Sequence, residues 1–212
     1  MPDSSLCLEM FDMPAVTISA AVEGDVDEAV VRKLIIETGA QPGSIYGKNG
    51  KGALRAKING YNNAARRAPW LVLVDLNGDA DCAPPLRRDW IPAPAAQLCF
   101  RVVVRQIEAW LMSDAETLAA YLSVPPKLVP ATPEAVENSK IAMVTLARRS
   151  RRRDMKKDIV PREGSGRAVG PAYTSRLIEY VTNHWRPEIA AARSDSLRRA
   201  MACLERLVAD AS

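Results

Sequence analysis

The uninterrupted apolar run at residues 70–74, Trp-Leu-Val-Leu-Val, constrains the fold of this chain more than any other segment. It ends at Asp75 and is too short for a typical helix, so it predicts a β-strand. Because none of its residues carries a charge, both sides of this strand are expected to be buried. Strands buried on both sides are typical of parallel sheets covered by helices, so the sequence predicts an α/β fold.

Strand-like and helix-like segments alternate through the first half of the chain. Alternation at this spacing is typical of right-handed βαβ units, so we expect a parallel sheet of about four strands flanked by helices. Residues 79–96 are rich in proline and are expected to be mostly loop, and residues 1–13 are expected to be an irregular lead-in. The predicted strands are 14–22, a short one near 44–46, 70–74 and 98–104, and the predicted helices are 26–38, 53–67 and 105–112.

The second half of the chain shows helical periodicity and no strong strand signal. We therefore divide the 212 residues into an α/β domain at 1–115 and a helical C-terminal extension at 116–212. A basic loop at residues 148–167 interrupts this extension. The chain is long enough for one sizeable domain with an extension of this kind. The helices predicted there are 113–122, 133–149, 171–185 and 195–209.

Composition excludes several classes of protein. Hydrophobic residues make up 48% and charged residues 25% of the chain, as in an ordinary folded protein, and the formal net charge is +4. The four cysteines, Cys7, Cys82, Cys99 and Cys203, form no CxxC pair, so we expect free thiols in a reducing cytoplasm rather than a zinc site. A single histidine, His184, excludes mechanisms that need two. No signal peptide or membrane-spanning run is recognisable.

Two acidic clusters follow predicted strands. The first, at residues 22–28, follows the strand at 14–22, and the second, at residues 75–81, follows the central strand. The carboxyl ends of parallel strands form the edge where α/β proteins bind ligands. Carboxylates gathered there would repel one another unless a cation lay between them, and hard oxygen ligands suit Mg²⁺ or Mn²⁺. The sequence therefore predicts a metal-dependent enzyme that acts on phosphate esters.

Within these clusters, Glu23 and Asp27 stand four positions apart across a predicted strand-to-helix turn. Asp75 ends the central strand, and Asp79 follows on the loop. Two cations held by such a set could activate a water molecule and stabilise the leaving oxygen in phosphodiester hydrolysis. A structural role is the alternative for each residue, because Asp is common at helix starts and the segment after Asp75 is also typical of a turn. The two clusters together favour the functional interpretation.

Glu108 follows a predicted strand and begins a helix, so it could be a further metal ligand or support one. The alternative is that Glu108 pairs with Arg101 or Arg105. We expect Trp110 to pack in the core rather than stack on a base, because it lies on an apolar helix face. Lys140 lies in a predicted helix and could be catalytic, but nothing local distinguishes it from a surface lysine.

The segment Val-Glu-Gly-Asp-Val-Asp-Glu after the first strand resembles the Glu-Gly-x-x-Asp/Glu signature of the Toprim domain. Topoisomerases, bacterial primases and OLD-type nucleases share that domain. The resemblance implies that Glu23 is the glutamate of the first motif, Asp27 its acidic partner and Asp75 the first aspartate of a second, Asp-x-Asp motif. The chain departs from the second motif at Asn77, where an aspartate is expected. Asp79 could substitute for it; otherwise the second metal site is weakened.

The chain is more similar still to stand-alone prokaryotic Toprim-like proteins, which carry a Glu-x-Trp element matched here by residues 108–110. Some of those proteins lie beside ATPase genes in anti-phage islands. The resemblance covers about residues 14–115 and implies Mg²⁺- or Mn²⁺-dependent hydrolysis of nucleic-acid phosphodiesters, in phage defence with a separate ATPase. It assigns catalysis to Glu23, Asp75 and Asp27, and metal binding to Glu23, Asp75, Asp79 and Glu108.

Basic residues gather in two places where they could contact phosphates, releasing counterions from the nucleic acid. Two lysines lie in the glycine-rich segment 47–52, and many arginines and lysines lie in the stretch 148–167. The alternative for both segments is a solvated, mobile loop. The residues expected to bind nucleic acid, with DNA as the expected polymer, are Lys48, Lys51, Arg151, Arg152, Arg153, Lys156 and Lys157.

Two other functions remain open on the sequence. The first is a non-catalytic Toprim-like subunit that binds an ATPase partner or nucleic acid, which Asn77 supports and a tight Mg²⁺ site would contradict. The second is another phosphoryl-transfer enzyme that acts on a nucleotide or a small phosphate ester. The basic stretch argues against the second, because a small substrate needs no extended positive surface. No membrane partner is expected, and a homodimer is compatible with the sequence.

Overall fold

Within residues 15–211, which the computed structural model describes, four parallel strands form one sheet. The predicted α/β fold, a parallel sheet of about four strands flanked by helices, is confirmed and is consistent with a Toprim-like architecture. The expected irregular lead-in at residues 1–13 lies outside the described residues. The strand order is β2-β1-β3-β4, with β1 at Thr17–Val22, β2 at Gln41–Gly47, β3 at Trp70–Asp75 and β4 at Leu98–Val103.

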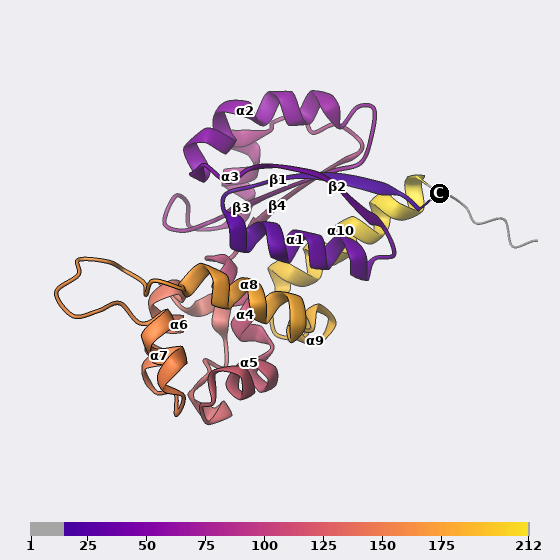
Figure 1. Ribbon diagram of the computed structural model, residues 1–212. Helices are drawn as coiled ribbons and strands as arrows, with labels where there is room; N and C mark the ends of the chain where they lie inside the picture. The colour runs from indigo at the N-terminus through magenta and orange to yellow at the C-terminus, as the bar shows by residue number, and fades with distance from the viewer. Residues whose placement is uncertain (1–14, 212) are drawn as a thin grey trace, which may run out of the picture.

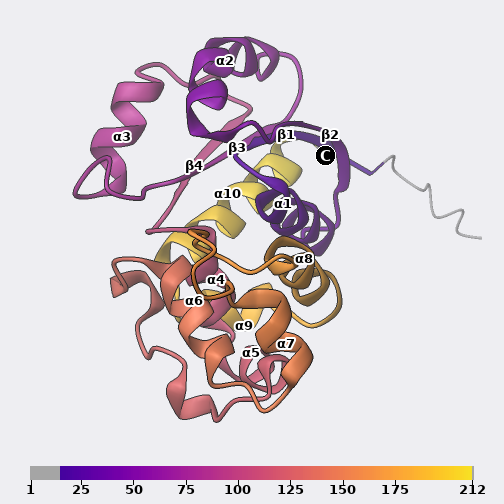
Figure 2. The same cartoon turned by 60° about the vertical axis from the view of Figure 1, so that its left-hand side comes forward.

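Helices cover both faces of the sheet, as Figures 1 and 2 show. On one face lie α2 (Gly50–Ala64) and α3 (Ala83–Trp90), and on the other lie α1 (Asp25–Glu37) and α10 (Asp195–Ala211). The sheet therefore separates two hydrophobic cores, and the larger one continues from the α1 face into the helices of the C-terminal half.

The apolar run in β3 follows from this three-layer arrangement. Successive side chains of a strand point to opposite faces of the sheet. Leu71 and Leu73 pack in the core on the α1 face, whereas Val72 and Val74 pack in the core on the α2 face. All four side chains are fully buried, so every position of the strand favours an apolar residue.

The C-terminal half is helical, as predicted, and packs against the α1 face rather than standing apart from it (Figure 1). α8 lies along α1, and α10 lies against β4. The proposed boundary at residues 115 and 116 stays a prediction. The helices between β4 and α10 are α4 (Ile107–Ser113), α5 (Ala115–Leu122), α6 (Ser139–Arg148), α7 (Arg153–Ile159), α8 (Tyr173–Asn183) and α9 (Pro187–Ala191), with 3₁₀ turns at Pro126–Leu128 and Pro133–Ala135.

The proline-rich stretch at residues 79–96 contains a full helix, α3, where a loop with one helical turn was expected. Pro84 and Pro85 are tolerated because they lie in the first turn, where a backbone N–H has no partner within the helix. Leu86 and Trp90, four positions apart, are both buried against the sheet. This apolar pair gives α3 a buried face that the prolines obscure in the sequence.

The basic stretch at residues 148–167, expected to be a loop, is also partly helical, because it contains α7. Met155 and Ile159 lie four positions apart and are fully buried, so they hold α7 against the core. The helix predicted at 133–149 is shorter than expected. It begins only after Asn138, whose side chain accepts a hydrogen bond from the backbone N–H of Ile141 and caps α6.

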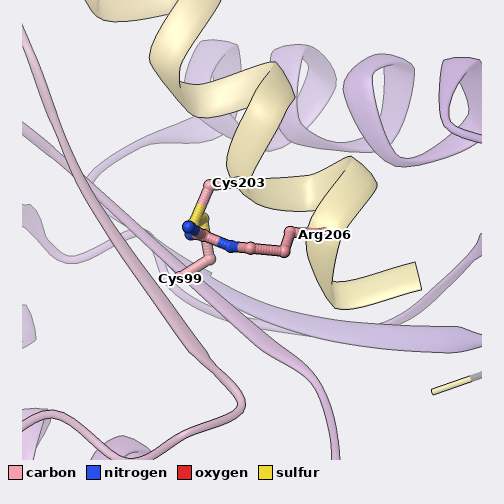
Figure 3. Close-up of a disulfide and its surroundings, with 3 residues drawn as sticks. All are labelled: Cys99, Cys203 and Arg206. Carbon is pink, nitrogen blue, oxygen red and sulfur yellow. A yellow bond between two sulfur atoms is a disulfide. The ribbon is translucent and has the colours of Figure 1, made fainter. Parts of the chain in front are cut away.

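The expectation of free thiols is wrong for one pair of cysteines. Cys99 on β4 and Cys203 on α10 form a disulfide across 104 residues of sequence (Figure 3). Local sequence could not indicate this pair, because only the packing of α10 against β4 brings the two residues together. Cys82 is a free, exposed thiol, and Cys7 lies outside the described residues. Within residues 15–211 the helices are all too short or too polar to cross a membrane.

A buried carboxylate ties α9 to the junction of α4 and α5. The side chain of Asp114 is fully buried and accepts hydrogen bonds from the backbone N–H of Arg186 at 3.1 Å and from its Nε at 3.0 Å and Nη2 at 2.8 Å. Burial alone would raise the pKa of Asp114, but the hydrogen bonds from Arg186 and Thr117 outweigh it, so this pKa lies below its ordinary value.

We expect Asp114→Asn to lower the melting temperature by several degrees at neutral pH, because the amide keeps the shape of the side chain but loses its charge. A lowered pKa stabilises the fold above the ordinary value of 3.8, and this stability is lost as the pH falls through the lowered pKa. The gap between variant and wild type should therefore narrow in acid, as measured by thermal melts across pH. Glu116→Gln is the control, since Glu116 pairs with the same arginine but is 82% exposed. A gap independent of pH would contradict this account.

Candidate functional site

The strands β1 and β3 are neighbours, but the chain continues from them to opposite sides of the sheet. β1 is followed by β2 on one side, and β3 is followed by β4 on the other. At such a switch point the two connections separate and leave a crevice outside the carboxyl ends of the strands, where α/β proteins bind their ligands. Glu23 directly follows β1, and Asp75 is the last residue of β3. The predicted acidic residues therefore lie where this topology places a ligand site.

Four carboxylates meet at this switch point: Glu23, Asp27, Asp75 and Glu108. Glu23 Oε1 accepts a hydrogen bond from the backbone N–H of Asp75 at 2.8 Å, which joins the ends of β1 and β3. Asp27 lies in the first turn of α1 and Glu108 in the first turn of α4, and their exposed fractions are only 7% and 2%. The structure thus brings together residues from the two acidic clusters and the start of α4.

Three oxygen atoms of this cluster have no hydrogen-bond partner although they are buried: Asp27 Oδ1, Asp75 Oδ1 and Glu108 Oε2. Burial and the charges of Glu23 and Glu108 raise the pKa of Asp27 to about 7. Burial and the charges of Asp27, Glu108 and Glu23 raise the pKa of Asp75 well above its ordinary range. Unpaired buried polar atoms cost about 1–3 kcal/mol each, so folded proteins rarely keep such a group without a ligand or a role.

Unpaired carboxylate oxygens at one place fit a hard divalent cation. Within the described residues, no group of three or more His, Cys, Asp or Glu side chains could hold a metal ion as the side chains stand. A site for Mg²⁺ does not require such a cage, because this ion keeps several waters and takes only one or two carboxylates directly. The donor set of Glu23, Asp75 and Glu108, with Asp27 beside it, therefore fits a hydrated Mg²⁺ or Mn²⁺ ion.

Two residues from the C-terminal half complete the cluster. Tyr173, at the start of α8, donates its hydroxyl to Glu108 Oε1 at 2.8 Å, and Lys140 Nζ on α6 lies 3.8 Å from the same oxygen. These contacts replace the arginine partners considered for Glu108. The sequence left Lys140 indistinct from a surface lysine and gave no reason to select Tyr173, because no local pattern shows that α6 and α8 begin beside α4.

Lys51, in the first turn of α2, and Asp79, on the loop after β3, form the rim of the site. Lys51 Nζ pairs with the carboxylate of Asp79 and donates a hydrogen bond to the backbone carbonyl of Asp75, so its charge lies directly beside the end of β3. The Asp79 side chain is 48% exposed. Asn77 has a positive φ of 50°, which asparagine adopts more readily than most residues. The backbone N–H of Asp79 donates to the carbonyl of Leu76 at 3.2 Å, so Asn77 lies within a turn, and its own N–H donates to the carbonyl of Arg105 at 2.8 Å.

The other predicted nucleic-acid-binding residues lie on the surface. Lys48 pairs with Glu28 at 2.8 Å, and Arg152 pairs with Asp154. A surface hollow of about 310 Å³ beside α7 is lined in part by basic side chains, and the loop after α7 projects from the molecule (Figure 1) before it reaches Tyr173. The exposed members of the predicted set in this region are Arg151, Arg152, Arg153, Lys156 and Lys157.

A scan against models of protein families found no match, and searches of curated proteins and of solved structures gave no significant match. Membership of the Toprim family therefore stays a prediction that rests on the motifs.

Proposed function

We propose that this protein hydrolyses phosphodiester bonds of nucleic acid, with DNA as the substrate, in a reaction that depends on Mg²⁺ or Mn²⁺. The observation that carries the proposal is the group of unpaired, buried carboxylate oxygens at the switch point between β1 and β3. A purely structural cluster would be expected to pair such oxygens with donors from the chain. The motif resemblance to Toprim nucleases supports the same activity.

Each carboxylate has a proposed role. Glu23, Asp75 and Glu108 bind metal ions, Asp79 contributes at the rim, and Asp27 supports the charge of the cluster. A bound ion would lower the pKa of a water molecule and neutralise charge on the phosphate. The protein itself orients the carboxylates: the backbone N–H of Asp75 donates a hydrogen bond to Glu23 and fixes the orientation of its side chain.

Three further side chains would act on Glu108 and on the substrate. Tyr173 holds one oxygen of Glu108 through its hydroxyl, which leaves the other oxygen unpaired. Lys140 and Lys51 supply positive charge beside the carboxylates, where a phosphate group would approach. The site thereby combines carboxylates that would bind a metal ion with lysines that would bind the phosphate. Phosphodiester hydrolysis needs both.

The basic surface supports nucleic acid as the substrate. The exposed arginines and lysines on and before α7 can neutralise successive phosphates of a backbone, and such binding weakens steeply as salt rises. Segments before and after these residues, Lys140 on α6 and Tyr173 on α8, contact the carboxylate cluster. We further propose that the protein is cytoplasmic and acts in phage defence with a separate ATPase. A homodimer is the oligomeric state to be tested.

A non-catalytic role as an ATPase- or nucleic-acid-binding subunit is the second candidate, and one observation favours it. The position where the second motif is expected to carry another aspartate holds Asn77, whose backbone forms a turn. A protein of this kind would bind nucleic acid or its partner without cleaving DNA.

The first experiment is a cleavage assay on supercoiled plasmid and on linear DNA, with Mg²⁺, with Mn²⁺ and with EDTA. We expect nicking or cutting by wild type with either metal and none with EDTA. Glu23→Gln should lose the activity, because the amide keeps the shape of the side chain but not its charge. Asp81→Asn is the matched control and should retain activity, because Asp81 is exposed on the loop after β3 and is not among the charges that act on the cluster.

Calorimetry with Mg²⁺ on the same three proteins decides between the two candidate functions. Binding by wild type and Asp81→Asn but not by Glu23→Gln is expected. Failure of wild type both to cut DNA and to bind Mg²⁺ would reject the nuclease in favour of the non-catalytic subunit. Binding without cleavage would keep the metal site and reject these two DNA forms as substrates.

A further inference from the structure

A cavity separate from the carboxylate cluster lies at the edge of the sheet, where β4 is the outermost strand of the described residues. Its volume is about 270 Å³, and residues of α3, β4 and α10 line it. Figure 2 shows α3 and α10 on opposite faces of the sheet. Three arginines from three different elements line it: Arg87 from α3, Arg101 from β4 and Arg199 from α10. None of the four carboxylates of the candidate metal site contributes to its walls.

Arg101 is the unusual member of this group. Its side chain lies on the face of β4 that α10 covers, two positions from Cys99, and its Nε is buried with no hydrogen-bond partner. No carboxylate in the described part of the chain lies within ion-pair distance of it, whereas Arg206 lies close by, beside the disulfide (Figure 3). Burial and the charges of Arg87, Arg206 and Arg199 lower the pKa of Arg101 to about 10. The guanidinium of Arg101 is thus surrounded by other positive charges.

Two carboxylates, Asp195 and Glu134, also line the cavity, but each already has hydrogen-bond partners other than Arg87 and Arg101. Asp195 pairs with Arg198 and, at 2.5 Å, with Arg199 on its own helix. Glu134 accepts hydrogen bonds from Ser194 Oγ at 2.6 Å and from the backbone N–H of Ser196 at 3.0 Å.

Arg87 and Arg101 therefore keep positive charge that no carboxylate of the described residues neutralises through an ion pair. A partly buried cation without a partner, such as Arg101, is unfavourable, so this arrangement is stabilised when an anion enters.

We infer that this cavity binds a phosphate group through Arg87, Arg101 and Arg199. Guanidinium groups offer paired N–H donors that match the oxygens of a phosphate, and three of them converge here from separate elements. The volume is near the lower end for ligand pockets, so it suits a phosphate monoester with a small substituent or the terminal 5′-phosphate of a nucleic acid. The inference is independent of the proposed nuclease activity, because it involves none of the metal-site carboxylates.

The test is a titration with inorganic phosphate in EDTA, followed by calorimetry and by the shift in melting temperature. EDTA prevents phosphate from binding through a metal ion at the carboxylate cluster. We expect wild type to bind phosphate and Arg87→Ala to bind it at least about tenfold more weakly, as for loss of one charged hydrogen-bond donor. Arg101→Met should lose binding as well. Arg88→Ala removes the same charge from the next position of α3, which does not line the cavity, and should bind like wild type.

Arg87 is exposed, so Arg87→Ala will fold even if Arg101→Met does not, and the test does not depend on the Arg101 variant. Absence of phosphate binding by wild type would overturn the inference. Equal weakening in Arg87→Ala and Arg88→Ala would also overturn it, since it would indicate general attraction to a basic surface. Both results are separate from the outcome of the cleavage assay, which uses other residues.

Competition identifies the source of the phosphate. A 5′-phosphorylated oligonucleotide that displaces phosphate, when its 5′-hydroxyl counterpart does not, assigns the cavity to the end of a nucleic acid. If neither oligonucleotide displaces phosphate, the ligand is a small phosphate ester. Both results support the anion site and differ only in which molecule carries the phosphate.

Discussion

Asp75→Asn is expected to abolish metal-dependent cleavage of DNA and, at the same time, to raise the stability of the metal-free protein. Cleavage should fall about a hundredfold or more, because the contribution of a bound cation to such a reaction amounts to several kcal/mol and Asp75 is a central ligand of the proposed site. Stability should rise by about 1 kcal/mol, because the amide removes a buried carboxylate from beside three others. Opposite effects on activity and stability are typical of residues kept for function.

Melting curves with and without Mg²⁺ measure the second half of this expectation. In EDTA the Asp75→Asn protein should melt above wild type. Added Mg²⁺ should stabilise wild type and leave the variant almost unchanged, because a ligand that binds only the folded state stabilises it by an amount that grows with the ratio of free ligand to its Kd. Asp81→Asn serves as the control in both conditions, because it removes an exposed charge on the same loop.

The contrary results are equally clear. A variant less stable than wild type in EDTA would mean that Asp75 holds the fold together, for example as a partner of the β1 end. A variant that cuts DNA at the wild-type rate would remove Asp75 from the proposed mechanism, whatever the metal dependence of the reaction.

The sheet and the four carboxylates of the candidate site were predictable because their signals are local. The run at residues 70–74 and the acidic residues after it are adjacent in sequence, and the carboxyl ends of parallel strands meet at one edge in any open α/β sheet. Glu23 and Asp75 are joined in the structure by a hydrogen bond that follows directly from this topology. The strand order that makes this edge a switch point could not be read from the pattern of strands and helices alone.

The rest of the site depends on how the C-terminal helices pack. Lys140 and Tyr173 come from α6 and α8, and no periodicity or motif shows that these helices reach α4. The disulfide and the arginine cavity could not be predicted from the sequence for the same reason, since both form only when α10 packs against β4. Helices α3 and α7 were obscured by proline and by positive charge, although each has two apolar residues four positions apart.

Trp110→Ala is expected to destabilise the protein by about 3–5 kcal/mol, as for other buried aromatic side chains cut back to alanine. Trp110 is fully buried in the core that joins α4 to the C-terminal helices. Its Nε1 donates to Ser196 Oγ at 2.7 Å, and its backbone carbonyl accepts a hydrogen bond from Trp185 Nε1 at 3.3 Å. This burial agrees with the prediction that Trp110 packs in the core, two positions after Glu108.

Denaturant unfolding of Trp110→Ala and Trp110→Phe, together with DNA binding by both, separates packing from base stacking. Phenylalanine refills much of the space and should cost markedly less stability than alanine. DNA affinity of the folded fraction should be the same in both variants and in wild type, because a side chain with no exposed surface cannot stack on a base. Weaker DNA binding by Trp110→Ala at unchanged stability would overturn the packing role. It would also place the Glu-x-Trp element in the nucleic-acid interface rather than beneath the carboxylate cluster.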